Sequence, residues 1–357
     1  MDPSDAPGRT DYRALRDRMG ADPFRRRIEK QAGIWARETH QGRGIFYLER
    51  FVPMDEILAR CLRGSGLAGW GRRNMLDLEL VRREAIFPHL PPEWDGFRLL
   101  QLADLHLDLA PELTPRILEK LRGVEFDQAV LVGDYHNRIG TEAKVSLGEM
   151  RKLIPALGPK PLGILGNHDF IEKVSFLEHC GLRILLNETV ALERGGSRLW
   201  VAGVDDPHFF RTHDLEAARR PIPPGEFSIL LSHSPETYRE AAALGFDFML
   251  SGHTHGGQIC LPGGWPIIRN ADVPRRLLSG PWREGKMQGY TSRGTGACGV
   301  AARFFCRPEI TLHTLRRELG ANPDMVGGQS IETGKPAPAG QAIPLVRPRS
   351  SDLNRRT

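Results

Sequence analysis

The sequence has few cysteines, and they are not arranged as in a zinc ribbon or a disulfide-rich module. The 357 residues include five cysteines, an odd number, and no Cys-x-x-Cys pair occurs. Neither a thiolate zinc site nor a disulfide framework is therefore indicated, and we expect a reducing compartment. The cysteines are Cys61, Cys180, Cys260, Cys298 and Cys306.

Long apolar runs are also missing. No stretch of about 18 apolar residues occurs, so the sequence predicts no membrane-spanning helix. The N-terminus is polar and rich in arginine, without the apolar core of a signal peptide. These features predict a cytoplasmic protein.

Neither charge nor aromatic content points to nucleic acid. The 49 Lys and Arg residues against 44 Asp and Glu give a net charge of +5, which suits phosphate-rich substrates or anionic membranes without proving either. Aromatic residues make up 7% of the chain, and they do not alternate with the basic ones as in single-strand-binding proteins. We therefore expect no nucleic-acid partner.

The chain divides by composition into three regions. Residues 1–75 are predicted to form a basic helical extension, in which apolar residues between 54 and 62 recur at helical spacing. Four glycines between 64 and 71 predict a linker. Residues 76–316 show short apolar runs typical of a domain with buried strands. Residues 317–357 are rich in Gly, Pro, Ser and Gln and are predicted to be disordered.

The extension has two surfaces that suit a membrane. The apolar face of residues 54–62 and the basic cluster Arg25, Arg26, Arg27 and Lys30 predict peripheral contact with an anionic lipid surface, or a cover over a lipid-binding groove. The alternative is an ordinary cap, whose apolar face packs on the domain that follows.

Five apolar runs in the middle region end in residue types that bind metals. The runs cover residues 97–103, 129–132, 162–165, 227–231 and 248–250. Strand ends of a layered α/β fold meet in one crevice, so these side chains are expected to converge. The polar residues that follow the runs are Asp104 and His106; Asp134; Asn167, His168 and Asp169; His233; and His253 and His255.

Each of these pieces alone has a simpler explanation. Asp104 and His106 could stand in an ordinary loop, Gly-Asp at residue 134 is common turn chemistry, and a lone His233 is normally satisfied within a core. His253 and His255 carry more weight, since imidazoles two residues apart lie on one side of an extended segment. Because all pieces occur together at strand ends, we favour a metal site.

The donor set predicts which ions bind and what they do. Carboxylate, amide and imidazole donors, with no cysteine among them, suit two divalent ions, Mn²⁺ first and Fe or Zn²⁺ as alternatives. Asp134 is the candidate bridge, because one carboxylate has two oxygens. His168 is expected to contact phosphate and protonate the leaving oxygen, with Asp169 fixing its tautomer.

These blocks resemble those of the calcineurin-like metallophosphoesterases over residues 98–258. Flanking stretches at 90–96, 202–207, 292–296 and 307–310 resemble the YkuE/YaeI-like branch, which is similar to calcineurin-like UDP-diacylglucosamine hydrolases. The chain departs from many relatives at residues 135–137, Tyr-His-Asn, where they carry a second acid after Gly-Asp. The resemblance does not reach residues 1–75.

The resemblance implies a fold, a ligand set and an activity. The fold is α/β (α+β), a four-layer α/β/β/α sandwich of two mixed sheets flanked by helices. The activity is hydrolysis of a phosphodiester or pyrophosphate bond. The resemblance and the basic N-terminus together favour a lipid-linked nucleotide, UDP-diacylglucosamine being the most specific form. From the N-terminal region we expect a cytoplasmic enzyme that is peripheral at the inner membrane surface. The implied ligands are Asp104, His106, Asp134 and His255 for one ion, and Asp134, Asn167, His233 and His253 for the other.

Two other functions remain open. A phosphomonoesterase, acting for example on phosphoproteins, would use the same metals. A non-catalytic scaffold of the same fold is disfavoured, because such proteins can lose their ligands and every expected ligand is present here, as is His168.

Overall fold

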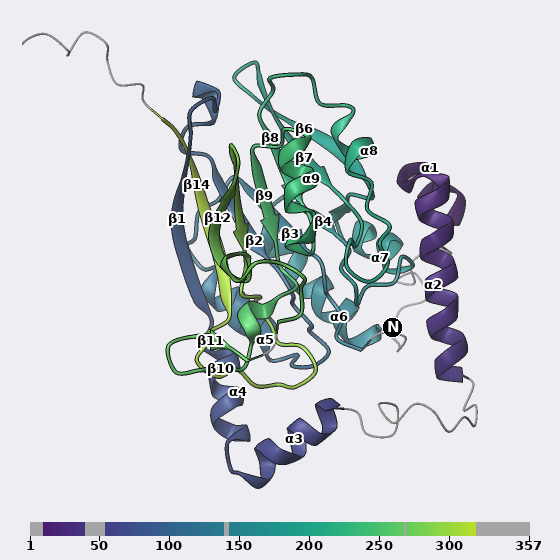
Figure 1. Ribbon diagram of the computed structural model, residues 1–357, viewed down its shortest axis with the longest axis vertical. Coiled ribbons are helices and arrows are strands. Elements are labelled where there is room, and N and C mark those ends of the chain that lie inside the picture. Colours follow the sequence, from purple (N-terminus) through teal and green to yellow (C-terminus); the bar gives the residue numbers. More distant parts are fainter. Residues whose placement is uncertain (1–9, 40–53, 139–142, 268, 319–357) are drawn as a thin grey trace, which may run out of the picture. The chain divides into compact units, whose positions relative to one another are not determined.

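The computed structural model describes residues 10–39, 54–138, 143–267 and 269–318 (Figure 1). The chain separates into two units, Met1–Glu318 and Leu319–Thr357. The tail predicted to be disordered therefore lies outside the described residues, except for its first two positions. The boundary proposed near residue 75 stays a prediction.

Two mixed sheets form the centre of the first unit. The first sheet has the strand order β1-β14-β2-β3-β4-β5 and the second β12-β13-β9-β8-β7-β6. The first comprises β1 (Glu79–Phe87), β14 (Glu309–Arg317), β2 (Arg98–Leu102), β3 (Gln128–Val132), β4 (Leu162–Ile164) and β5 (Arg183–Ile184). The second comprises β12 (Gly280–Glu284), β13 (Met287–Thr291), β9 (Phe248–Ser251), β8 (Ser228–Leu231), β7 (Ser197–Gly203) and β6 (Glu188–Arg194).

Most neighbouring strands run parallel, and the exceptions make both sheets mixed. In the first sheet β14 is antiparallel to β2 and parallel to β1. In the second, the pairs β6–β7 and β12–β13 are antiparallel. The strands that precede the predicted ligands, β2, β3 and β4 in one sheet and β8 and β9 in the other, are parallel within each sheet. Their carboxyl ends can therefore meet at one edge.

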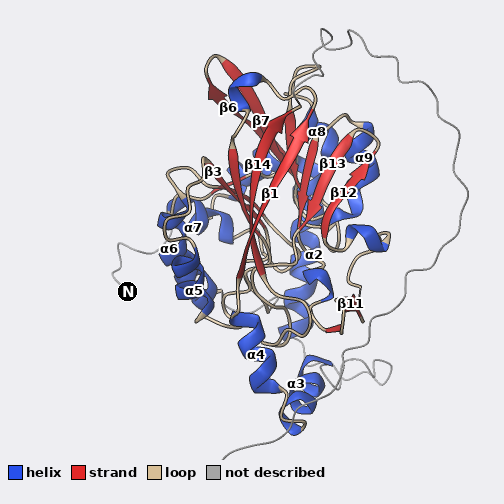
Figure 2. Ribbon diagram, turned by 90° about the vertical axis from the view of Figure 1, so that its left-hand side faces the viewer, coloured by secondary structure: helices blue, strands red, loops and turns tan. Residues whose placement is uncertain are grey.

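Alternation along the central strands produces four layers. In β2, Leu99 lies in the core between the sheets, whereas Leu100 and Leu102 lie in the core beneath the helices. Figure 2 shows α5, α6 and α7 on one side of the strands and α8 and α9 on the other. The predicted α/β/β/α sandwich is thereby confirmed. The helices are α5 (Leu113–Lys120), α6 (Lys144–Leu153), α7 (Lys173–His179), α8 (Leu215–Arg219) and α9 (Tyr238–Ala243).

The N-terminal region contains the expected helices α1 (Tyr12–Met19), α2 (Ala21–Thr39) and α3 (Met54–Gly64). The predicted linker is wrong, because residues 68–76 form a further helix, α4 (Ala68–Leu76). Gly71 allows this helix to approach the loop beyond β13: a Cβ there would lie 2.7 Å from the Cβ of Ala302. This glycine serves close packing rather than chain flexibility.

The membrane role assigned to the basic cluster needs correction at Arg27. Its side chain is fully buried and forms an ion pair of 3.0 Å with the equally buried Asp205. Lys30 donates hydrogen bonds to the carbonyl oxygens of Phe209 and Phe210, at 2.9 and 2.8 Å. Arg27 therefore has no access to a lipid surface, because it joins α2 to the segment that follows β7. In the described part of the chain, no helix combines the length and apolarity needed to cross a bilayer.

Candidate metal centre

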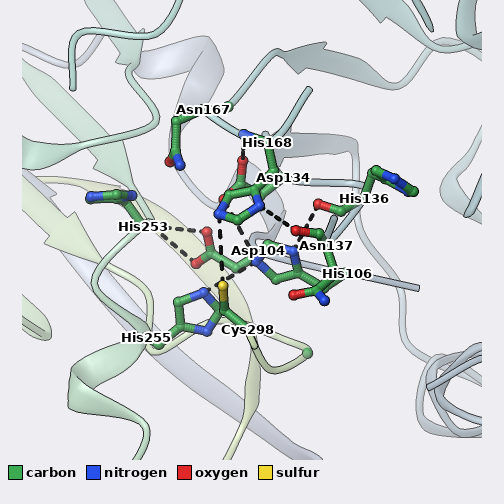
Figure 3. Close-up of polar contacts among 12 residues, drawn as sticks. Asp104, His106, Asp134, His136, Asn137, Asn167, His168, His253, His255 and Cys298 are labelled. Atoms are coloured by element: carbon green, nitrogen blue, oxygen red, sulfur yellow. Dashed lines mark hydrogen bonds and ion pairs between the residues drawn. The ribbon is translucent and has the colours of Figure 1, made fainter. Parts of the chain in front are cut away.

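The ends of β2, β3, β8 and β9 and the loop after β4 bring the predicted ligands together. Figure 3 shows six of them, with His233 left unlabelled. Donor atoms of Asp104, His106 and Asp134 all lie within 4.8 Å of one another. The Nε2 atom of His106 is 3.6 Å from Oδ2 of Asp134 and 3.3 Å from Nε2 of His255. We call these four residues the first cluster.

A second cluster lies on the other side of Asp134. Donor atoms of Asp134, His233 and His253 also lie within 4.8 Å of one another. The Nε2 atom of His233 is 3.2 Å from Oδ2 of Asp134 and 2.9 Å from Oδ1 of Asn167. Asp134 thus belongs to both clusters, and its carboxylate lies between two groups of imidazoles.

Backbone carbonyls orient three of the imidazoles. His106 Nδ1 donates to the carbonyl of His136 at 2.9 Å, and His233 Nδ1 donates to that of Val132 at 2.8 Å. The carbonyl of Asn270 accepts from His253 Nε2 at 3.0 Å. Because one ring nitrogen of each donates outward, the other nitrogen offers a lone pair to a metal ion once the ring is neutral.

The electrostatics of the centre also suit cations. Burial lowers the pKa of His106 to about 4 and that of His253 to about 3, so both rings are neutral, as metal binding requires. Burial also raises the pKa of Asp104 to about 7, because its negative charge is removed from water. Burial acts to lower the pKa of His233, but the nearby carboxylates of Asp134 and Asp104 raise it to about 10. Divalent cations can supply this compensating positive charge, so the donor set fits them.

Many of these residues share an uncommon backbone conformation. Five of the seven predicted metal ligands have a positive φ, in the left-handed region that non-glycine residues rarely occupy. Such conformations cost roughly 1–3 kcal/mol each and persist only where the surrounding structure enforces them. The fold therefore holds the donors in a fixed arrangement. The angles are 52° at Asp104, 42° at His106, 58° at Asp134, 68° at His253 and 51° at His255.

His168 lies beside the first cluster and is only partly buried. Its ring centroid is 5.0 Å from that of His106. Its Nδ1 donates to the backbone carbonyl of Asn137 at 2.5 Å, so this carbonyl fixes the tautomer. The side chain of Asn137 in turn accepts from the amide of Gly299 at 2.9 Å.

The expected contact between Asp169 and the His168 ring is therefore corrected. The carboxylate of Asp169 accepts from the amides of Asp134 and Gly166, at 2.7 and 3.1 Å, and pairs with Lys173 at 3.1 Å. Through these bonds Asp169 fixes the backbone of the turns that carry Asp134 and Asn167 relative to each other. Its place in the motif had suggested a catalytic partner, but its short side chain reaches the neighbouring backbone first.

Helix α2 supports the same turns from outside. The Arg27 guanidinium donates to the backbone carbonyl of Asp169 as well as pairing with Asp205. Gln31 accepts from the amide of Ile171 at 3.0 Å. The turn that carries Asn167 and His168 is thereby tied to the N-terminal region, a role that the arginine-rich composition alone could not reveal.

The sequence prediction also overlooked Cys298. Its sulfur lies within 4.8 Å of the donor atoms of His106 and His255, although no cysteine was expected among the donors. The signal available in the sequence was its position, two residues after the 292–296 stretch that resembles the YkuE/YaeI-like branch. A single cysteine without a Cys or His nearby in sequence gives no further cue.

Comparison with known proteins agrees with this geometry. Residues 97–257 match the calcineurin-like phosphoesterase family. The uncharacterized metallophosphoesterase YkuE of Bacillus subtilis is 30% identical over 268 residues, which cover 71% of this chain and 90% of that protein. YkoQ of the same organism is 28% identical over 63% of this chain and 85% of its own length. The phosphodiesterase YaeI of Escherichia coli is 28% identical over 66% and 87%.

The chain therefore belongs to the calcineurin-like metallophosphoesterases. It is a hydrolase that acts on phosphoric esters, in a family that uses divalent metal ions.

Proposed function

We propose that this enzyme cleaves a phosphodiester or pyrophosphate bond with two divalent ions bridged by Asp134. The observation that carries this proposal is the membership of Asp134 in both donor clusters. The first ion would be held by Asp104, His106, Asp134 and His255, and the second by Asp134, Asn167, His233 and His253. Mn²⁺ is the first candidate for this nitrogen and oxygen set, with Fe and Zn²⁺ as alternatives. When bound, the ions lower the pKa of a water molecule and hold the phosphoryl oxygens.

The chain's own residues supply the proton and the orientation. The Nδ1 atom of His168 donates a hydrogen bond to the Asn137 carbonyl. Its Nε2 is therefore the atom that can carry a proton to the leaving oxygen. Partial exposure gives this ring access to substrate, whereas the predicted ligands are buried. His168 therefore acts as the general acid, and Asp169 acts through the backbone as a positioning residue.

We propose further that the ester is lipid-linked, UDP-diacylglucosamine being the most specific form. An apolar patch supports this substrate class. The patch lies at the end of the molecule where Figures 1 and 2 place α4 and the hairpin of β10 (Cys260–Leu261) and β11 (Trp265–Pro266). Its exposed side chains are Leu67, Trp70, Leu261, Trp265, Ile267 and Phe305.

Two members of the patch are in contact, and its hairpin lies in the segment that follows the metal loop. The Trp70 ring packs edge-on against Phe305, with centroids 5.7 Å apart. The segment that carries Trp265 starts beyond His255 and ends before Asn270, whose carbonyl holds the His253 ring. Arg275 stacks over Trp265 and adds positive charge. Acyl chains could lie on this patch while the phosphate ester reaches the ions.

Part of the N-terminal region instead behaves as a cap. Leu58, Ala59 and Leu62 of α3 pack against a small cluster that includes Val300 and Phe304. This contact supports the alternative account of the apolar face of residues 54–62. We therefore propose that residues 1–75 contribute to lipid contact through α4, while α3 covers the domain.

Metal analysis combined with two model substrates tests the reaction. The purified enzyme should contain two ions per chain and should hydrolyse bis-p-nitrophenyl phosphate faster than p-nitrophenyl phosphate when Mn²⁺ is added. Asp134→Asn should lower metal occupancy and remove most activity, whereas Asp17→Asn, at an exposed position of α1, should change neither. One ion or none in active protein would contradict the proposal. Faster cleavage of the monoester would favour a phosphomonoesterase.

The lipid-linked substrate needs a separate test. Mass spectrometry of lipid extracts from cells depleted of the protein should show a nucleotide-linked lipid that accumulates. Purified enzyme should then hydrolyse the accumulated compound. An unchanged level of UDP-diacylglucosamine would remove the support for this substrate and leave the proposed diester activity unaffected.

A further inference from the structure

The loop that carries Cys298 is fixed to the strand end that carries Asp104. The amide of Thr295 donates to the carbonyl of Ala103 at 2.7 Å, and the amide of Gly296 donates to that of Asp104 at 2.9 Å. A side chain at Gly296 would overlap the carbonyl oxygen of Leu105. The loop thus lies directly on the backbone of the first cluster. Its position is fixed relative to Asp104 by these two hydrogen bonds.

Side chains from two other segments fix Cys298 itself. The amide group of Gln258 accepts from the Cys298 amide at 2.8 Å and donates to its carbonyl at 3.0 Å. Asn137 accepts from the next amide, that of Gly299. Gln258 follows His255 closely in sequence and has a left-handed backbone, with φ of 52°. The Cys298 backbone is therefore held by Gln258, in the loop after β9, and its neighbour Gly299 by Asn137, in the turn after β3.

This arrangement directs the sulfur toward two imidazole nitrogens. The Cys298 Sγ and the donor atoms of His106 and His255 lie within 4.8 Å of one another. The Nε2 atoms of the two histidines face each other at 3.3 Å, while their Nδ1 atoms contact the His136 carbonyl and Arg303. Both rings are buried. Two imidazoles and a thiol converging in this way form a donor set suited to borderline and soft metal ions.

We propose that the thiolate of Cys298 is a further ligand of the ion in the first cluster. This inference rests on the proposed metal function of that cluster. Metal binding would displace the thiol proton, and sulfur would favour Zn²⁺, Fe²⁺ or Co²⁺ over Mn²⁺ relative to a site built only from nitrogen and oxygen. Cys298 thus makes the metal preference of this chain differ from that predicted from its Asp, Asn and His residues alone.

A second role for the sulfur must be separated from the first. Cys298 Sγ lies 3.7 Å from His168 Nε2, so the thiol could act only as a neighbour of the general acid. A neighbour of His168 would alter turnover and leave the spectrum of a bound metal unchanged. A ligand would alter the spectrum and the metal affinity.

Cobalt substitution provides the spectroscopic readout. The full-length protein is freed of metal, loaded with Co²⁺ and analysed for metal content and for absorption in the visible and near ultraviolet. The wild type should show a thiolate-to-cobalt charge-transfer band in addition to the visible bands of Co²⁺. Cys298→Ser should lose the charge-transfer band while the visible bands remain. Cys180→Ser, at the end of α7, is the matched control and should keep both.

Competition between metals gives an independent measurement. Cys298→Ser should weaken Zn²⁺ binding at least as much as the removal of a group that only hydrogen-bonds to a metal ligand, which costs roughly 10–100-fold. Its Mn²⁺ affinity should change less. Equal changes for both ions would overturn the assignment of sulfur as a ligand.

The outcomes separate this inference from the proposed function. A wild type that binds two Co²⁺ ions and cleaves diesters without a charge-transfer band overturns the inference alone. A band that persists in Cys298→Ser also overturns it, because another sulfur would then be the ligand. A wild type that shows the band but binds only one ion would keep Cys298 as a ligand and overturn the two-ion proposal.

Discussion

Gly252 stands between the two strand ends that supply Asp104 and His253. A Cβ at this position would lie 2.7 Å from Oδ2 of Asp104 and 2.8 Å from the Cβ of Ala103. Gly252→Ala should therefore displace the Asp104 carboxylate and weaken metal binding, because the added methyl group would overlap it. The metal content and the midpoint of a metal titration would show the effect.

Gly148→Ala provides the control for that prediction. Gly148 lies in α6 and has no atom within 4 Å of the position that a Cβ would take. Since alanine is also the better helix former, by about 1 kcal/mol, this substitution should stabilise the fold slightly and leave metal binding unchanged. Normal metal affinity in Gly252→Ala would show that the Asp104 carboxylate can be displaced without effect.

His168 provides a prediction about the leaving group. His168→Ala should keep the metal content and reduce kcat by about 10²–10⁴ on substrates with poor leaving groups, the usual contribution of a general acid. The reduction should be smaller for nitrophenyl esters, whose leaving group needs little protonation. His179→Ala, at an exposed position of α7, should have wild-type rates on both. Equal reductions for the two substrate types would contradict the acid role.

At the scale of residues, the sequence predicted donor types better than their detailed roles. Asp104 and His255 could be found because each follows an apolar run, and the ends of buried strands converge. The role of Asp169 in positioning these turns could not be predicted, since its hydrogen bonds to the backbone depend on how two turns that are distant in sequence meet. Cys298 was missed for the same reason: Gln258 and Asn137, which are remote from it in sequence, hold its loop beside the first cluster.

Helix α2 acts as an element of the catalytic framework. Arg27 and Asp205 are both fully buried, and the Arg27 guanidinium also lies 3.6 Å from the centre of the Phe210 ring. Arg27→Ala should lower the free energy of unfolding by about 3–5 kcal/mol, because it leaves the Asp205 charge buried without its partner. Urea unfolding would measure this loss.

A double substitution tests the cause of that loss. Arg27→Met combined with Asp205→Leu removes both charges and should be less destabilising than Arg27→Ala alone, since no unpaired charge remains. Arg26→Ala, at an exposed position on the same helix, should change the unfolding free energy little. If Arg27→Ala and Arg26→Ala were equally stable, the buried pair would contribute nothing.

At the scale of elements, continuous apolar runs predicted the positions of buried strands correctly, whereas the cluster of glycines wrongly predicted a linker. The runs before the ligands became β2, β3, β4, β8 and β9, because strands covered on both faces are apolar throughout. The strand β1 gave no such run, since most of its side chains are only partly covered and its sequence contains Arg82, Arg83 and Glu84. Gly71 was assigned to a linker because its packing partner, Ala302, is remote in sequence.

The apolar patch leads to a prediction about the whole molecule. The full-length protein should float with anionic liposomes, and added salt should weaken the binding, because each basic residue near such a surface contributes about 1 kcal/mol that salt screens. Replacing Trp265 and Ile267 by serine should reduce flotation. Ile86→Ser, at a similarly exposed position on β1, should not.

A shortened protein separates lipid contact from folding. A chain starting at Leu76 lacks Arg27, the partner of Asp205, and the Gln31 contact with the turn after β4, so we expect this protein to be unstable. Failure of the full-length protein to bind liposomes, together with an unfolded shortened chain, would identify residues 1–75 as a structural cap. Liposome binding by a folded shortened chain would locate the lipid surface on the catalytic domain alone.

The left-handed backbone at five of the predicted metal ligands restricts how such a centre can change during evolution. Asp, Asn and His are the residue types, apart from glycine, that most readily adopt this conformation, and they are also good metal donors. An exchange such as Asp104→Glu keeps the carboxylate but loses the side chain suited to the backbone. New metal preferences must therefore arise at neighbouring positions without this constraint. Position 298 is one of them, because Cys298 is not among the described residues with positive φ.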